Sequence, residues 1–397
     1  MPFRTLREFI QLESSAGVIL FIAAILALII DNTGWHQYYE AFFDLHFTVQ
    51  IADYKLSKPL QLWINDGLMT IFFLLVGLEI KREMFEGELS SMSKAVLPAI
   101  AAVGGMLVPG LIYFLLNRGD AVALRGWAIP TATDIAFSLG ILALLRSRLP
   151  VSLKIFLTAL AIFDDIGAII IIAIFYTVHI SVVMLSIATG CVVLLVVLNR
   201  FQVMAITPYV LVGIALWLCV LNSGVHATLA GIVLAFAIPI RDKRYTDVSP
   251  LRSLEHKLHP WLAFGVLPIF AFANAGVSFA GISLYELFSP ITLGIGAGLF
   301  LGKQIGIFGA SWLGVKLGFA KKPHGSTWFG VYGVGLIAGV GFTMSLFIGT
   351  LAFHGHDGSY DAMVRVGVIG GSFLSGLLGY LILRFTQPRH EHHSLVP

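Results

Sequence analysis

The chain has 397 residues, of which 57% are hydrophobic and only 12% are charged, and its formal net charge is +3. A soluble domain carries about 25% charged residues, so this composition excludes a soluble globular protein and indicates one that crosses a membrane many times. The small positive charge concerns membrane topology and does not indicate nucleic-acid binding.

Apolar stretches recur along the chain and predict its membrane-spanning helices, each of which needs about 20 residues. Twelve segments fit this length: 15–30, 60–80, 95–116, 127–145, 151–175, 182–199, 206–221, 225–240, 259–280, 291–314, 329–353 and 364–385. We therefore expect an all-α polytopic membrane protein with one transporter domain over residues 1–385. Residues 386–397 would form a cytoplasmic tail, whose histidines fit a solvated tail or an expression-tag remnant better than a metal site.

Lysine and arginine are distributed unequally between the two sets of connections. The richer set, which includes both chain ends, holds Arg4, Arg7, Lys81, Arg82, Lys94, Arg146, Arg148, Arg200, Arg241, Lys243, Arg244, Arg252, Lys257, Lys316, Lys321, Lys322, Arg384 and Arg389. The poorer set holds Lys55, Lys58, Arg118 and Arg125. Because cytoplasmic loops are enriched in these residues, we expect both termini in the cytoplasm.

The longest outward connection, residues 31–58, contains an alternating segment from Phe47 to Leu56 with a polar break in its middle. This pattern favours a small β-hairpin. Outside the bilayer, its exposed strand edge could pair with a second copy of the chain. The alternative is an ordered loop packed on its own subunit.

Two spans contain residues that interrupt a helix. Span four has Pro130 and two threonines, with Asp134 deep in the segment, and span eleven has repeated glycines between Gly333 and Gly341. A pair of interrupted segments in corresponding positions of two halves of a chain is typical of a transporter's binding site, because half-helix ends and freed carbonyls can hold ions there. Glycines also permit close helix packing, so Asp134 is the stronger evidence for an ion site.

Two adjacent carboxylates, Asp164 and Asp165, lie in the middle of the apolar span five. An ionised Asp at the centre of a membrane helix costs about 2.5–3.5 kcal/mol, so such residues usually face a cavity or a partner and mark an ion path. Successive helical residues point about 100° apart, so one carboxylate could face a pathway while the other meets a fixed partner. The alternative is a pair of helix-end carboxylates at a misplaced boundary.

Lys303 lies among glycines and apolar residues in span ten, where it cannot easily reach the interface. It needs an anion, and one aspartate of the pair is the obvious candidate. If Lys303 were near the interface, it would instead be an ordinary snorkelling residue. A cation and a proton would compete for the carboxylate oxygens, which suffices for antiport if the site faces each side in turn. Sodium suits carboxylates, hydroxyls and carbonyls, and no cluster has transition-metal spacing.

A second charged group is expected at the cytoplasmic edge of the membrane. It comprises Glu79, Lys81, Arg82 and Glu83 at the end of span two and Glu255, His256, Lys257 and His259 before span nine. Histidines beside glutamates titrate between about pH 5 and 8 and could form a pH sensor. The alternative is a solvated juxtamembrane cluster that determines topology.

Motifs spread over nearly the whole chain resemble the NhaA family of bacterial sodium/proton antiporters. They are Leu62–Asp66, Phe73–Glu83, Ala132–Phe137, Phe163–Ala168, Ser223–Gly231, Phe270–Gly276 and Gly341–Ser345. The resemblance implies a twelve-helix protein of the inner membrane with inverted repeats and two discontinuous helices that cross. It also implies an outward hairpin that supports a homodimer.

The resemblance assigns roles to matching positions of this chain. Asp165 would be the main cation carboxylate, assisted by Asp164, with Thr133 and Asp134 at the helix break. Lys303 would pair with Asp164. The exchanged ions would be Na+ or Li+ and H+, with no cofactor. Exchange would be electrogenic and would increase at alkaline pH.

The resemblance also assigns the pH response to the cytoplasmic-edge group. Its members there are Glu79, Arg82, Glu83, Glu255, His256 and His259. Thr158 departs from the family pattern, which leads us to expect an apolar residue about two turns before the aspartate pair. Its hydroxyl would either join the site or bond its own helix.

Two other functions remain open on the residues alone. A sodium-coupled solute symporter would need a basic or aromatic site for an organic solute, which the sequence does not show. An intramembrane aspartic protease would use two carboxylates that share a proton. Such enzymes carry a Gly-x-Gly-Asp arrangement, which Phe163-Asp164-Asp165 lacks, so we expect a transporter and no enzyme.

Overall fold

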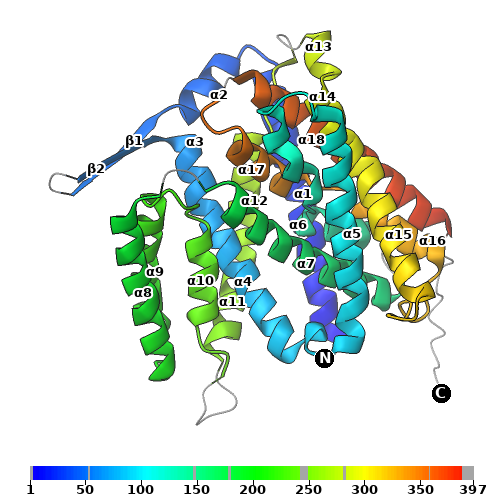
Figure 1. The fold of residues 1–397 in the computed structure, drawn as a ribbon, viewed down its shortest axis with the longest axis horizontal. Coiled ribbons are helices and arrows are strands. Elements are labelled where there is room, and N and C mark those ends of the chain that lie inside the picture. The colour runs from blue at the N-terminus through cyan, green and yellow to red at the C-terminus, as the bar shows by residue number, and fades with distance from the viewer. Residues whose placement is uncertain are drawn as a thin grey trace. The chain divides into compact units, whose positions relative to one another are not determined.

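The computed structural model describes residues 3–51, 54–145, 149–177, 180–241, 249–279, 283–356 and 358–386. The predicted tail lies outside the described residues except for Thr386. The same holds for five of the basic residues used to predict topology: Arg146, Arg148, Lys243, Arg244 and Arg389. The described chain is mostly helical, as its apolar composition predicts (Figure 1).

The chain folds into two compact units, each built from separate stretches of sequence. The first comprises residues 1–18, 92–164 and 283–397, and the second comprises residues 19–91 and 165–282. Two helices, α1 (Phe3–Asp31) and α7 (Val151–Phe175), contribute residues to both units. The expectation of one transporter domain over 1–385 stays a prediction.

The first unit packs its helices around an apolar core. Its other elements are α5 (Met92–Asn117), η3 (Ala123–Thr131), α6 (Ile135–Leu144), α13 (Leu284–Leu287), α14 (Pro290–Ala297), η7 (Gly298–Gly302), α15 (Lys303–Lys316), α16 (Trp328–Ile337), α17 (Phe342–Ala352) and α18 (Gly358–Thr386). Leu142, Leu157, Ile307 and Val334 bring α6, α7, α15 and α16 into this core. Helices α5 and α15 approach closely because glycines face each other, and a Cβ on Gly104 would lie 2.3 Å from the Gly306 carbonyl oxygen.

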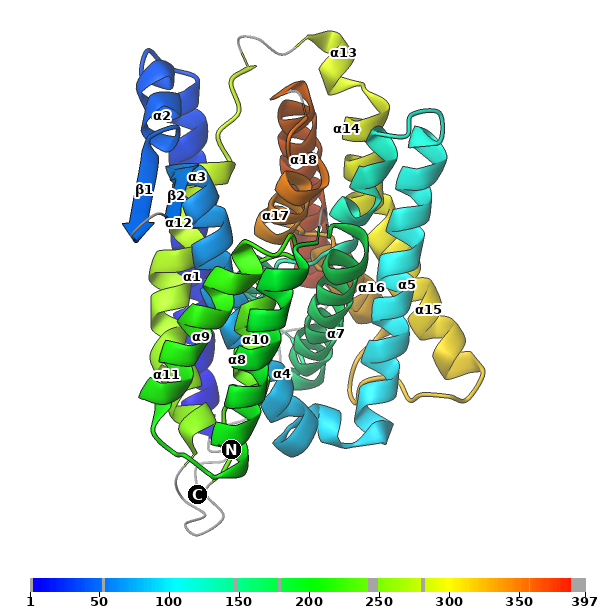
Figure 2. The same ribbon diagram turned by 60° about the vertical axis from the view of Figure 1, so that its left-hand side comes forward.

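The second unit has a separate apolar core. Its other elements are α2 (His36–Phe43), β1 (His46–Ile51), β2 (Tyr54–Pro59), α3 (Leu60–Trp63), η1 (Ile64–Leu68), α4 (Met69–Glu86), η2 (Glu88–Ser90), α8 (Val182–Arg200), α9 (Ile206–Leu221), α10 (Leu229–Ala237), α11 (Pro250–Trp261), η5 (Leu262–Val266) and α12 (Leu267–Asn274). Helices α8, α9 and α10 lie side by side (Figures 1 and 2). Leu195, Leu216 and Leu234 join them in the core.

The predicted hairpin is confirmed as a two-stranded antiparallel sheet. Strands β1 and β2 pair from His46 with Pro59 to Ile51 with Tyr54. A cross-strand hydrogen bond of 2.9 Å joins the hydroxyls of Thr48 and Ser57. The turn at residues 52–53 lies outside the described part of the chain.

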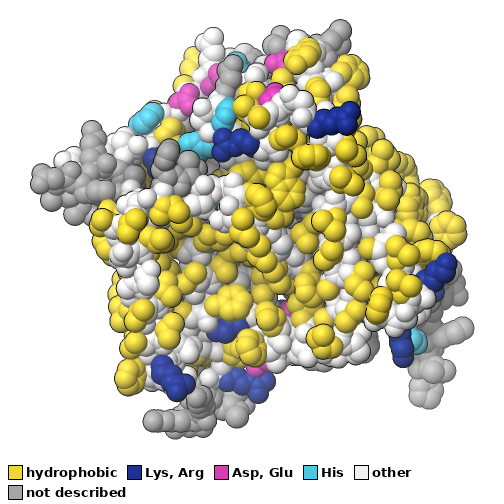
Figure 3. Space-filling view, viewed as in Figure 1, with side chains coloured by type: hydrophobic (Ala, Val, Ile, Leu, Met, Phe, Trp, Pro, Cys, Tyr) yellow, Lys and Arg dark blue, Asp and Glu magenta, His cyan; other side chains and the backbone are white. Residues whose placement is uncertain are grey.

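The helices have the length and apolar surface of membrane spans. Among the described residues, seven helices are long and apolar enough to cross a membrane, or up to nine if each of two bent helix pairs is one span. Hydrophobic side chains are widespread over the face in Figure 3, and Lys and Arg side chains are few there. The protein is therefore a multi-pass membrane protein, while the count of twelve spans and the inverted repeats stay predictions.

Both segments that contain helix-interrupting residues include a stretch without α-helical geometry. Helix η3 is a 3-10 helix that ends at Thr131, and α6 begins at Ile135. Helices α16 and α17 are separated by residues 338–341 and are bent by 46° relative to each other. These two interruptions belong to the same unit, and they position the site described next.

Candidate functional site

The two adjacent aspartates lie in helix α7, and each has only 1% of its surface exposed. Asp164 is the last residue of the first unit's stretch, and Asp165 begins that of the second unit. Thr158 lies in the same helix and is half-buried. The contacts described below centre on Asp164, and the role of Asp165 as the main cation carboxylate stays a prediction.

Lys303 and Asp164 form a buried ion pair. The distance between Lys303 Nζ and Asp164 Oδ2 is 2.6 Å, and both side chains are 0% exposed. Lys303 comes from the first turn of α15, so the pair joins two helices that are distant in sequence. The stability of the protein depends strongly on both partners of a buried ion pair, because removal of one leaves an uncompensated charge in a medium of low dielectric constant.

The hydroxyl of Thr133 links this ion pair to both helix interruptions. Lys303 Nζ donates to Thr133 Oγ1 at 3.0 Å. Thr133 Oγ1 lies 2.6 Å from Asp164 Oδ2 and 2.8 Å from the carbonyl oxygen of Ala338. A hydroxyl has one hydrogen, so Thr133 donates to only one of these acceptors at a time. The arrangement therefore provides two alternative hydrogen-bonding states beside the same carboxylate.

Asp134 accepts hydrogen bonds at the starts of two helices. Its Oδ1 accepts from the Phe137 N–H at 2.9 Å and caps α6. Its Oδ2 accepts from the Thr343 N–H at 3.1 Å and from the Thr343 hydroxyl, in the first turn of α17. Helix N-termini carry unpaired N–H groups and a partial positive charge. One buried carboxylate therefore satisfies donors of both helix starts.

Two serines satisfy carbonyls where the interrupted segments meet. Ser138 of α6 donates to the Ile337 carbonyl at 3.2 Å, and Ser345 of α17 donates to the Ile129 carbonyl at 2.7 Å. Sequence reasoning gave these residues no role, and it gave none to Thr343. Thr343 and Ser345 lie in the motif Gly341–Ser345, but a small polar residue inside a buried apolar run is common in membrane helices and therefore does not specify a role.

The site offers oxygen ligands to a hard cation. Within the described part of the chain, Asp164 Oδ1 is buried and has no hydrogen-bond partner. The Thr133 hydroxyl lies beside the same carboxylate, and the Ala338 carbonyl contacts that hydroxyl. Carboxylate, hydroxyl and carbonyl oxygens suit a hard cation such as sodium. The geometry therefore fits a monovalent cation and a proton as alternative occupants of one carboxylate.

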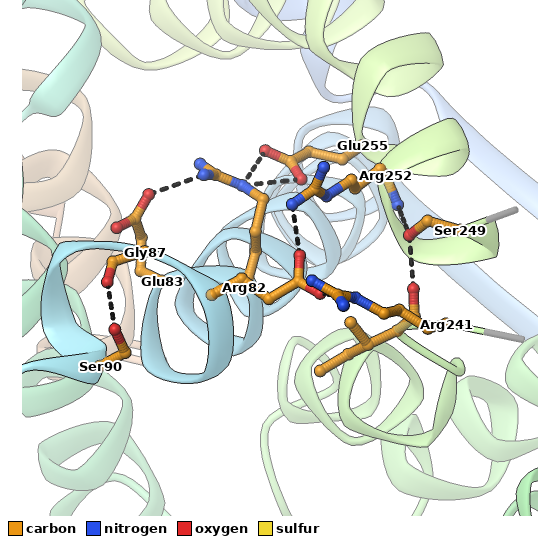
Figure 4. A network of polar contacts seen from close by, with 10 residues as sticks. Arg82, Glu83, Gly87, Ser90, Arg241, Ser249, Arg252 and Glu255 are labelled. Atoms are coloured by element: carbon orange, nitrogen blue, oxygen red, sulfur yellow. Dashed lines mark hydrogen bonds and ion pairs between the residues drawn. The ribbon is translucent and has the colours of Figure 1, made fainter. Parts of the chain in front are cut away.

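The second unit holds the predicted cytoplasmic-edge residues, and three of them form one ion-pair cluster (Figure 4). Arg82 Nε donates to both carboxylate oxygens of Glu255, at 2.9 and 3.1 Å. A terminal nitrogen of Arg82 lies 2.7 Å from Glu83 Oε1. One guanidinium therefore balances carboxylates from α4 and α11.

The remaining members of the predicted pH-response group lie around this cluster. Glu79 is half-buried and interacts electrostatically with Arg82, Glu83 and Glu255. Burial raises the pKa of the Glu255 carboxyl, and Arg82 opposes that increase. On the same helix α11, His259 is half-buried. His256 is exposed.

A second part of this network was not predicted from the sequence. Glu86 forms ion pairs with Arg241 and Arg252 (Figure 4). The two arginines were recognised only as charges that determine topology, and Glu86 was given no role. Their pairing depends on the fold, because the arginines lie 155 and 166 residues after Glu86 in the chain.

Lys81 also has a structural contact that its sequence context did not indicate. Its ammonium donates at 2.6 Å to the carbonyls of both Phe236 and Ile238, at the end of α10. A cation at a helix C-terminus satisfies carbonyls that lack intrahelical donors and opposes the partial negative charge there. Lys81 therefore ties α4 to α10.

A buried Lys–Asp pair beside two interrupted helices, in a protein with many apolar helices, defines a membrane ion transporter. The described residues contain no cluster of three metal-ligating side chains. The chain belongs to the Na+/H+ antiporter 1 family, whose model matches residues 7–383.

Several bacterial relatives match the chain over nearly its whole length. A Na+/H+ antiporter NhaA of Rhodospirillum rubrum is 57% identical over 393 residues, covering 98% of both chains. One of Syntrophotalea carbinolica, named Na+/H+ antiporter NhaA 1, is 56% identical and covers 97% of both chains. The NhaA antiporter of Pseudomonas fluorescens is 54% identical over 96% of this chain and 97% of its own. The resemblance read from the sequence motifs is therefore confirmed.

Replacement of Lys303 by Met is expected to destabilise the protein by about 3–5 kcal/mol, because it leaves the Asp164 carboxylate buried without its cation. The free energy of unfolding in detergent measures this loss. Adding Asp164→Asn to the same chain should recover part of it. Lys316→Met is the matched control, since Lys316 is an exposed lysine of the same helix. Equal stability of the Lys303 and Lys316 variants would contradict the energetic role of the pair.

Glu255 is expected to make stability depend on pH. Because its pKa is raised above the ordinary 4.5, the folded protein holds this proton more tightly than the unfolded chain. The contribution is present at low pH and is lost as the pH increases from 4.5 through the raised pKa. In the wild type, Glu255 should lower the thermal unfolding temperature by about 2 °C between the two ends of this pH window, and Glu255→Gln should remove that decrease. The same slope in the variant as in the wild type would refute this assignment, and Arg200→Gln, an exposed change, is the control.

Proposed function

We propose that the protein is a secondary antiporter that expels cytoplasmic Na+ or Li+ in exchange for external H+. The observation that carries the proposal is the buried Lys303–Asp164 pair, whose Asp164 Oδ1 has no hydrogen-bond partner among the described residues. Membership of a Na+/H+ antiporter family and full-length relatives named Na+/H+ antiporter support it.

In this proposal the exchange depends on competition for carboxylate oxygens. Asp165 is the main cation carboxylate and Asp164 assists it, as the adjacent residue of α7. The Thr133 hydroxyl is a further oxygen beside Asp164, and the Ala338 carbonyl contacts that hydroxyl. A bound cation favours deprotonated carboxylates and a bound proton removes the charge that holds the cation. The cation and the proton therefore displace each other as the site faces the two sides of the membrane in turn.

In this proposal Lys303 controls whether the Asp164 carboxylate is available to a cation during exchange. The ammonium neutralises Asp164 while no cation is bound, and it must loosen its contact when a cation takes the same carboxylate. We assign the electrogenic step to these charges: two carboxylates can release more than one proton for each monovalent cation. This charge imbalance makes exchange sensitive to membrane potential.

Asp134 and Thr133 enter the proposal through the helix interruptions. Both oxygens of Asp134 already accept hydrogen bonds from the starts of α6 and α17. We therefore assign Asp134 the task of a fixed negative charge that keeps these starts beside the ion pair. Thr133, unlike Asp134 in the contacts given above, contacts Asp164 and Lys303 directly.

The proposed architecture has twelve membrane helices in inverted repeats, with spans four and eleven discontinuous. The interruptions after η3 and α16, together with the side-chain contacts between them, support it. The excess of Lys and Arg on one set of connections supports a bacterial inner-membrane protein with both termini in the cytoplasm.

The pH response is assigned to the cluster of Arg82, Glu83 and Glu255 with the neighbouring Glu79, His256 and His259. Loss of the Glu255 proton as the pH rises strengthens its attraction to Arg82, which ties α4 to α11. Activation at alkaline pH follows if this tie favours the exchanging state.

The hairpin is proposed as the contact of a homodimer. Its two strands pair only with each other among the described residues, and Phe47 is 57% exposed. An unpaired strand edge is a template for a second copy of the same strand. The proposed partner is therefore the same chain, joined through the outward connection.

Purified protein in proteoliposomes with an imposed proton gradient is expected to release protons when Na+ or Li+ is added. Asp165→Asn should reduce this flux at least about 100-fold, because it removes an oxygen charge and a proton site. The measurement is the pH-dependent fluorescence of an internal dye from pH 6.5 to 9. Asp44→Asn, an exposed carboxylate change, is the control. No sodium response at any of these pH values, or full flux in the Asp165 variant, would refute the assignment, and solute uptake driven by sodium would indicate a symporter.

Deletion of residues 46–59 is expected to convert the purified dimer into a monomer, because it removes both strands of the hairpin. Light scattering of the detergent-purified protein, corrected for bound detergent, measures the mass. Thr48→Ala with Ser57→Ala, which loses one cross-strand hydrogen bond and keeps the strands, serves as the control. A deletion variant that stays dimeric would place the contact elsewhere.

A further inference from the structure

The helix that carries Lys303 contains a widened turn directly before this residue. Helices α14 and α15 are joined by the π-helical segment η7, from Gly298 to Gly302. The backbone N–H of Lys303 bonds the carbonyl of Gly298, five residues earlier, and not that of Leu299. Such π segments are rare and often occur at functional sites. The Leu299 carbonyl thereby loses the donor that a regular α-helix would give it.

Two buried side chains supply donors to carbonyls of this segment. Ser375 of α18 donates to the Leu299 carbonyl at 3.3 Å, and Gln304 donates from Nε2 to the Phe300 carbonyl at 2.7 Å. Ser375 is 0% exposed and Gln304 is 6% exposed. A buried carbonyl without a donor is costly. The Ser375 contact therefore favours the widened turn over a regular one, and the Gln304 contact attaches the first turn of α15 to the π segment.

Tyr332 fixes Gln304 from a third helix. Its phenol in α16 donates to Gln304 Oε1. The ring of Tyr332 also packs edge-on against Phe308 of α15, with the ring centroids 5.6 Å apart. The amide of Gln304 is thus held at both ends, by α16 at its oxygen and by the π segment at its nitrogen.

The Leu299 carbonyl lies directly against the interruption between α16 and α17. A Cβ on Gly339 would lie 2.3 Å from this oxygen and 2.6 Å from Ser375 Oγ, so glycine is required there. The residue before Gly339 is Ala338, whose carbonyl lies 2.8 Å from Thr133 Oγ1. The hydrogen bond of Ser375 therefore lies one residue from the group that contacts the ion pair.

We propose that Ser375 and Gln304 are positioning residues for Lys303. They keep the widened turn in the register that brings the Lys303 ammonium to Asp164 and Thr133. If the turn closed into a regular α-helix, the residues after it would rotate by about 100°, the angle of one residue. The ammonium would then leave the carboxylate. The inference rests on the proposed function, because it assigns these residues to the ion pair used in exchange.

The first experiment measures Na+-dependent proton flux in proteoliposomes for Ser375→Ala and Gln304→Leu. Each variant is expected to raise the apparent KM for Na+ about tenfold and to shift the pH profile, as loss of one hydrogen bond to a buried group predicts. Ser375→Thr keeps a hydroxyl and should restore both values. The matched control is Ser311→Ala, because Ser311 is a buried serine of α15 whose hydroxyl has no partner among the described residues.

The second experiment measures how accessible the Lys303 ammonium is to a chemical reagent, and it needs no transport assay. The purified protein is treated with a small amine-reactive ester, and modification of Lys303 is quantified by peptide mass spectrometry. The fully buried ammonium should react slowly in the wild type and in Ser311→Ala, and several-fold faster in the Ser375 and Gln304 variants. Tyr332→Phe, which keeps the ring, replaces any variant that fails to fold.

The two experiments separate the inference from the proposed function. Faster labelling of Lys303 in a protein that exchanges no sodium would support the positioning role and refute the antiport. The inference would be overturned if the Ser375 and Gln304 variants had the same Lys303 labelling rate, KM for Na+ and pH profile as the wild type. A loss of thermal stability alone, with labelling and pH profile unchanged, would also overturn it, because that result assigns these residues to folding only.

Discussion

The structure of the first unit depends on one ammonium group that is completely removed from water. Lys303 can remain charged there only because Asp164 and Thr133 contact it, and each of these comes from a different part of the chain. Asp164 requires a long apolar helix, Thr133 requires a break in its segment, and Lys303 requires the turn after η7. The ion pair therefore imposes constraints on several helices at once.

The helix breaks beside this pair create a second electrostatic problem, since each break exposes unpaired N–H and C=O groups in an apolar surrounding. The protein satisfies them with side chains of the opposite polarity. Asp134 accepts from the starts of α6 and α17, while Thr133, Ser138 and Ser345 donate to freed carbonyls. One of these groups, Thr133, also contacts the Asp164 carboxylate, so the breaks and the buried ion pair share this side chain.

The second unit uses charges differently. At the end of α4, Arg82 is shared between Glu83 and Glu255, and Glu86 is held by Arg241 and Arg252. These groups are partly accessible to water, and burial raises the pKa of Glu255 while Arg82 opposes that increase. The charge of Glu255 therefore affects the contact between α4 and α11. The pair of the first unit, by contrast, is completely buried.

Much of this protein could be predicted from its sequence, because a bilayer leaves few choices. Apolar stretches of sufficient length specify helices, Asp164, Asp165 and Lys303 are conspicuous because burial of charge is costly, and the alternating segment 47–56 specified a hairpin. The sequence could not specify contacts between distant segments. The π turn before Lys303, the donor role of Ser375 and the pairing of Glu86 depend on which helices pack together. Local sequence determines where a helix forms and where a charge must be buried at a cost in free energy. Tertiary packing determines which partner compensates that charge.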